Sequence, residues 1–113
     1  MLKGIHPLLG PDLLHVLRSM GHGDDIVIAD ANFPVTFLGP RVVRADGVDA
    51  VAMAEAILTH MPLDTFVPEA AWRMEVVGDP GAVPEVCATF QEIVHRHAGD
   101  FTIHSVERFA FYE

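Results

Sequence analysis

The chain has 113 residues, half of them hydrophobic, so residues 1–113 fit a single domain with enough apolar side chains for a core. The formal net charge is −9, and the sequence contains no basic stripe. Both observations argue against nucleic acid and against an anionic membrane surface as partners. The lone cysteine, Cys87, excludes an intrachain disulfide, and we expect a cytoplasmic protein without a signal region or membrane span.

The first half of the chain predicts two helices separated by extended segments. A helix is predicted over 11–20, because a proline suits its first position and apolar residues recur at helical spacing. The apolar run 26–30 predicts a buried strand, and a shorter strand is expected over 42–44. A second helix is predicted over 50–60, with Asp49 as its N-cap.

The second half continues the alternation of strands and helices. Residues 72–77 alternate as a strand does, and 78–81 predict a turn. A third helix is predicted over 84–97 and another strand over 100–106. This alternation predicts an α/β fold, which we expect to be a three-layer sandwich with a central mixed sheet in a single domain.

His22 is the first candidate for chemistry, because it stands alone between two glycines directly after the first predicted helix. The glycines leave the imidazole uncrowded, and an imidazole donates and accepts protons near neutral pH. His22 therefore fits a proton shuttle. The alternative is a histidine that only offsets the negative end of the helix dipole.

Asp30 is the second candidate, because it closes the predicted strand 26–30. Ligands bind at the carboxyl ends of strands in open α/β sheets, and a carboxylate there can accept hydrogen bonds from the hydroxyl groups of a polyol. The alternative is an Asx turn or N-cap that starts the following loop.

Arg108 is the third candidate, because it follows the last predicted strand and opens an aromatic-rich hexapeptide. Aromatic ring faces stack on sugars, and the guanidinium fork binds pairs of oxygen atoms. The alternative is a surface ion pair with Glu107 or Glu113.

The sequence predicts no metal site and no nucleotide cofactor. His95 and His97 are two residues apart and diverge on a helix, and no other histidine pair has a zinc-like spacing. Glycine-rich phosphate-binding loops and a serine-hydrolase elbow are also absent from the sequence.

Several short motifs, in order along the whole chain, resemble the ribose pyranase/fucose mutarotase family and are closest to its L-fucose mutarotase branch. They are Met20-Gly-His-Gly-Asp24, Asp30-Ala-Asn-Phe-Pro34, Gly39-Pro40, Arg44-Ala-Asp-Gly47 and Arg108-Phe-Ala-Phe-Tyr-Glu113. Family chains continue beyond the point that matches Glu113, so we expect a mutarotase-like domain without the family's C-terminal strand segment.

The resemblance implies an isomerase that interconverts the α and β anomers of L-fucose without cofactor or metal. It implies that His22 is the proton donor and that Asp30 and Arg108 bind the sugar. It also implies an α/β sandwich assembled into a homo-oligomer, a decameric ring among bacterial members. The alternatives are a D-ribose pyranase-type activity and a non-catalytic sugar-binding module on the same fold.

The predicted strand also has a consequence for the location of the pocket. Its two ends, Ile26 and Asp30, would lie about 13 Å apart, and His22 precedes the strand. One monosaccharide would then not easily reach both His22 and Asp30. We therefore expect the pocket to form at a subunit interface, with His22 and Asp30 brought together across it or by a sharp bend.

Overall fold

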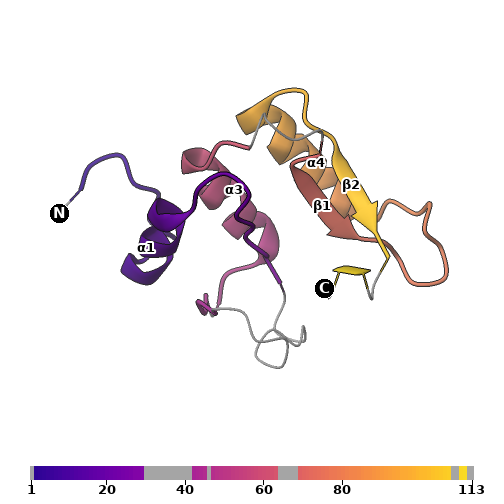
Figure 1. The fold of residues 1–113 in the computed structure, drawn as a ribbon, viewed down its shortest axis with the longest axis horizontal. Coiled ribbons are helices and arrows are strands. Elements are labelled where there is room, and N and C mark those ends of the chain that lie inside the picture. Colours follow the sequence, from indigo (N-terminus) through magenta and orange to yellow (C-terminus); the bar gives the residue numbers. More distant parts are fainter. Residues whose placement is uncertain (1, 30–41, 46, 64–68, 108–109, 112–113) are drawn as a thin grey trace. The chain divides into compact units, whose positions relative to one another are not determined.

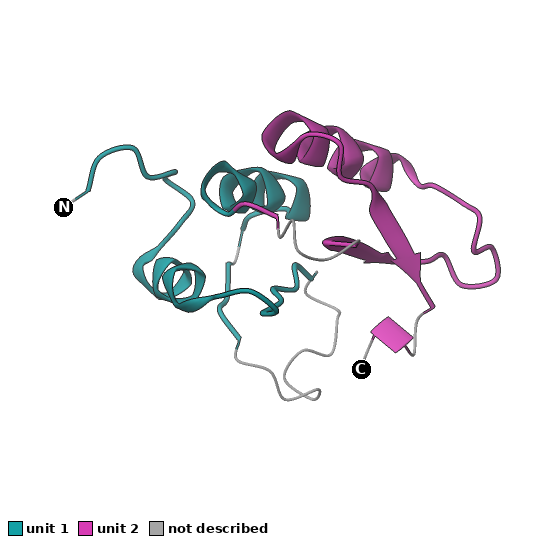
Figure 2. Ribbon diagram, turned by 45° about the horizontal axis from the view of Figure 1, so that its top comes forward, with its two compact units in different colours: residues 1–61 teal, residues 62–113 magenta. Residues whose placement is uncertain are grey.

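A computed structural model describes residues 2–29, 42–45, 47–63, 69–107 and 110–111. The elements follow one another as two helices and then a strand, a helix and a strand (Figure 1). The chain divides into two compact units, unit 1 (residues 1–61) and unit 2 (residues 62–113), which are coloured separately in Figure 2. Unit 1 holds the two N-terminal helices, and unit 2 holds the strands.

The two helices in the described part of unit 1 begin and end close to the predicted residues. Helix α1 spans Pro11–Ser19, and the N–H of its C-cap residue, Met20, donates to carbonyl groups of the preceding turn. Helix α3 spans Ala50–His60. The Asp49 side chain accepts a 2.7 Å hydrogen bond from the Ala52 N–H, which confirms Asp49 as the N-cap.

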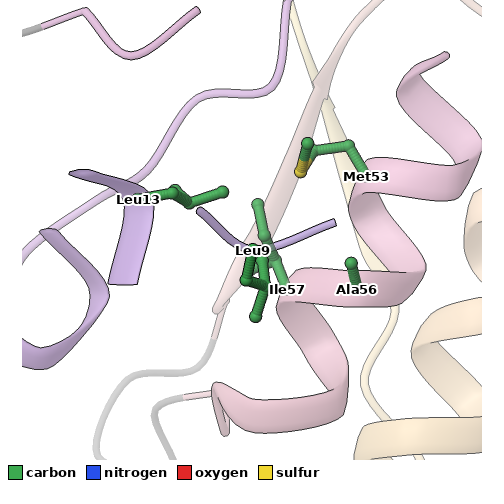
Figure 3. Close-up of a cluster of buried hydrophobic side chains, with 5 residues drawn as sticks. All are labelled: Leu9, Leu13, Met53, Ala56 and Ile57. Atoms are coloured by element: carbon green, nitrogen blue, oxygen red, sulfur yellow. The ribbon is translucent and has the colours of Figure 1, made fainter. Parts of the chain in front are cut away.

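The core of unit 1 lies between α3 and the segment that leads into α1. Its buried side chains are Leu9, Leu13, Met53, Ala56 and Ile57 (Figure 3). Partly buried apolar side chains surround them, including Ile26, Val43 and Val48. Loop residues on both sides of the helices therefore contribute to the same core.

The two strands predicted for unit 1 are wrong over the residues that the structure describes. Residues 26–29 and 42–44 have no regular secondary structure. A single side chain from each segment, Ile26 or Val43, packs against the core. The neighbouring Val27 and Ile28 are 55% and 37% exposed. An apolar run becomes a strand only where a second strand pairs with it, and the described part of unit 1 contains none.

The irregular backbone of residues 26–29 also removes the geometric reason to expect a pocket shared between subunits. The separation of about 13 Å between Ile26 and Asp30 holds only for a regular strand over 26–30. Residues 26–29 are irregular, and Asp30 lies outside the described residues. A strand therefore does not fix the distance between the side chains of His22 and Asp30.

Unit 2 is a strand–helix–strand unit. Strand β1 (Ala71–Met74) and strand β2 (Ile103–Val106) pair in parallel, with Ala71 opposite Ile103 and Met74 opposite Val106. Helix α4 (Glu85–Ala98) connects them, as a parallel pair requires (Figure 1). This confirms an α/β protein. The described sheet is parallel, and the mixed sheet of a three-layer sandwich stays a prediction.

Helix α4 is tied to the start of β2 by the Gln91 side chain. Its Nε2 donates to the Phe101 carbonyl and its Oε1 accepts from the Ile103 N–H, each at 2.9 Å. Ile93 and Val94 are the buried residues of the helix. Gly99 ends it with φ of 86°, a left-handed conformation that favours glycine.

Candidate functional site

His22 lies in a tight turn directly after α1, within unit 1. The turn consists of residues 21–24, with His22 and Gly23 at its centre. Two hydrogen bonds close it: the Asp24 N–H donates to the Gly21 carbonyl at 3.1 Å, and the Gly21 N–H donates to Asp24 Oδ2 at 2.8 Å. His22 is therefore held at the tip of a short, closed loop.

The conformation of this turn explains why glycine follows His22. Gly23 has φ of 88°, and a positive φ at the third position is what a type II turn requires. A side chain at position 23 would be strained there. The His22 side chain is exposed, so a substrate can approach the imidazole without displacing the core.

The other two predicted site residues, Asp30 and Arg108, lie outside the described residues. Each directly follows a described residue: Ala29 precedes Asp30, and Glu107, the residue after β2, precedes Arg108. Their proximity to His22 stays a prediction.

Unit 2 carries a second group of polar and aromatic side chains, which the sequence reasoning did not single out. The rings of Trp72 and His104, opposite each other on β1 and β2, have centroids 5.5 Å apart. His104 Nδ1 lies 3.9 Å from Glu69 Oε1. An open pocket lies beside His104 and is lined also by Asp100, Phe101 and Thr102. The alternation of residues 72–77 predicted that Trp72 lies on one face of a strand. It did not predict that His104 of β2 is its neighbour.

The described residues also include Asp24, whose role the sequence reasoning missed. Its carboxylate bonds back to the residue that starts the turn, as aspartate often does in loops. The signal was an aspartate two residues after His22, but the same residue type could equally serve as a helix cap or a solvated charge.

Metal binding and membrane spanning find no support in the described part of the chain. No group of three or more histidine, cysteine, aspartate or glutamate side chains there could hold a metal ion. None of the described helices has the length and apolar character needed to cross a membrane.

The sequence matches the model of one protein family, described as the RbsD / FucU transport protein family, over residues 3–113. The chain belongs to the RbsD/FucU family. Its expected resemblance to ribose pyranases and fucose mutarotases is thereby confirmed. The family match extends across both units, so they are parts of one family domain.

Relatives within the RbsD/FucU family are similar over almost the whole chain. The fucose mutarotase of Bos taurus is 43% identical, over 100% of this chain and 77% of the bovine protein. FucU from Bifidobacterium longum is 43% identical with a TM-score of 0.88, over 97% of this chain and 80% of that chain. The fucose mutarotase of Streptococcus pneumoniae, solved in complex with L-fucose, is 38% identical with a TM-score of 0.89. The match covers 98% of this chain and 79% of that chain.

Proposed function

We propose that this chain is an isomerase that interconverts the α and β anomers of L-fucose. The observation that carries this proposal is the 43% identity to the bovine fucose mutarotase over the full length of the chain. A structural relative solved with L-fucose supports the same sugar as the substrate. The exposed histidine in a closed turn supplies a group suited to the reaction.

The proposed mechanism is general acid–base catalysis of ring opening and closure. His22 donates a proton to the ring oxygen while a base removes the proton of the anomeric hydroxyl. The bond between the anomeric carbon and the ring oxygen breaks, and a carbonyl group forms at that carbon. Rotation about the adjacent carbon–carbon bond exposes the other face, and the reverse proton transfers close the ring.

This reaction requires little of the protein beyond proton transfer and orientation. No atom is gained or lost and no net oxidation occurs, so the chemistry needs neither a redox cofactor nor a co-reactant. Histidine suits the role because its ordinary titration lies near neutral pH. A positioned acid or base accelerates such a step about 10²–10⁴-fold.

Asp30 and Arg108 are proposed to bind the sugar. A carboxylate accepts hydrogen bonds from hydroxyl groups, and a guanidinium donates two bonds in a fixed fork. Arg108 follows β2 closely in sequence, and Asp30 follows a segment of unit 1 that begins at Ile26, a partly buried residue packed against the core. Both positions are the ones that the family resemblance implies.

Exchange NMR on L-fucose tests the proposed function directly. The protein is added to equilibrated L-fucose, and magnetisation transfer between the two anomeric protons is measured against the matching dialysis buffer. We expect the exchange rate to rise in proportion to protein concentration. D-Ribose is the second substrate, since a preference for it would indicate the pyranase-type alternative. Binding of fucose without faster exchange would indicate a sugar-binding module.

Asp30→Asn is expected to weaken L-fucose binding by roughly 1–3 kcal/mol, because a hydrogen bond to a charged acceptor is lost. Arg108→Lys should weaken it too, since a point charge does not reproduce the fork. Calorimetric titration with L-fucose measures both. Asp25→Asn and Arg18→Lys are matched controls at exposed positions. A parental affinity in either test variant would remove that residue from the site.

We also propose that the chain forms a homo-oligomer and that it is located in the cytoplasm. A decameric ring is the assembly that its family resemblance implies. Large apolar side chains that are exposed in the single chain, among them Trp72 and Val83, support assembly. The lone Cys87 is consistent with a reducing compartment. Light scattering coupled to size-exclusion chromatography would give the mass of the assembly, and a monomeric mass would contradict this proposal.

A further inference from the structure

The loop that carries His22 depends on a side chain outside the proposed catalytic group. Between α1 and the irregular segment 26–29, the chain reverses within four residues, 21–24. The backbone hydrogen bond from the Asp24 N–H to the Gly21 carbonyl is 3.1 Å long. The second closing bond is shorter, 2.8 Å, and it uses the Asp24 carboxylate as acceptor for the Gly21 N–H.

The shorter bond is the one expected to fix the turn. A hydrogen bond to an ionised acceptor is shorter and stronger than one between neutral groups. His22 has a glycine on either side, and glycine restricts the backbone least of all residues. Without the carboxylate, the turn would keep its backbone bond but lose its shorter closing bond, in a loop with two highly permissive positions.

We propose that Asp24 is a positioning residue that fixes the orientation of His22 by closing the turn with its carboxylate. The inference rests on the proposed role of His22 in proton transfer. Asp24 does not contact the sugar in this scheme; it acts through the backbone of the loop. Proton transfer requires the donor within hydrogen-bonding reach of the ring oxygen, so a loosened loop reduces the fraction of productive encounters.

Asp24→Ala is expected to lower kcat for anomer exchange about 10- to 100-fold, the scale of a displaced catalytic group, with little change in KM. Asp24→Asn should restore most of the activity, because the amide oxygen still accepts from the Gly21 N–H. Asp25→Ala, an equal change in charge at the adjacent exposed residue, should leave kcat unchanged. Asp24 is exposed, so the variants should keep the parental fold, which circular dichroism checks.

Nitrogen-15 relaxation supplies a readout that does not depend on activity. The amides of Gly21, His22 and Gly23 should become more mobile in Asp24→Ala and stay ordered in Asp24→Asn and Asp25→Ala. Full activity and an ordered loop in Asp24→Ala would overturn the proposal. Equal losses in the alanine and asparagine variants would also overturn it, because they would show that charge rather than the hydrogen bond matters.

The same experiments separate this inference from the proposed function. If the parent protein does not accelerate exchange, or if His22→Ala is as active as the parent, the proposed function fails and the positioning role fails with it. If the parent is active, His22→Ala is inactive and Asp24→Ala is fully active, only the positioning role fails.

Discussion

His22→Ala is expected to remove the catalysed part of L-fucose anomer exchange, a loss of about 10²–10⁴-fold relative to the parent protein. The alanine side chain cannot donate a proton to the ring oxygen, while the hydrogen bonds that close the turn involve only Gly21 and Asp24 and are retained. Exchange NMR at several protein concentrations separates the catalysed rate from the spontaneous rate.

His15→Ala is the matched control for this variant. His15 is exposed on α1, a few residues before His22, and no catalytic role is assigned to it. The His15→Ala variant should exchange fucose anomers at the parental rate. If His22→Ala keeps the parental rate while its circular dichroism and L-fucose affinity are unchanged, the proton shuttle must be a different residue.

Ile57→Ala is expected to lower the free energy of unfolding by about 2–5 kcal/mol, because it leaves a cavity as well as removing apolar area. Ile57 is 3% exposed and lies in the cluster that joins α3 to Leu9 and Leu13 (Figure 3). Urea denaturation at a fixed protein concentration measures the change, since assembly would make stability concentration-dependent.

Ile28→Ala makes the same chemical change at a residue that is 37% exposed. It should cost clearly less than Ile57→Ala, because the deleted atoms are already partly hydrated and leave no closed cavity. Equal losses in the two variants would contradict the assignment of Ile57 to the core.

The helices were predictable from the sequence because their signals are local. The proline at the start of α1 and the N-cap Asp49 before α3 each act within one turn of helix. Strands depend on partners that are distant in sequence. The strands predicted over 72–77 and 100–106 are therefore confirmed in outline, because β1 and β2 pair with each other. The equally apolar run 26–30 has no strand in its described residues, 26–29.

The candidate site was predictable to a smaller extent. The glycines around His22 indicate a turn, and the structure has one there. The roles of Asp30 and Arg108 came from the family resemblance, since a carboxylate or guanidinium beside an expected strand end has equally good structural explanations. Asp24 could not be identified beforehand, because its hydrogen bond depends on the backbone angles of the turn rather than on residue type alone.

The Gln91 side chain has a consequence for the order in which unit 2 assembles. Ala71 and Ile103 are partners in the sheet although all of α4 separates them, so the strand pair must first close a long loop at a cost in chain entropy. Helix α4 needs only local contacts, and Gln91 then holds Phe101 and Ile103 beside it. We expect pulse-labelled hydrogen exchange to protect the α4 amides first, those at the start of β2 next, and the β1 amides last; early protection of β1 would contradict this order.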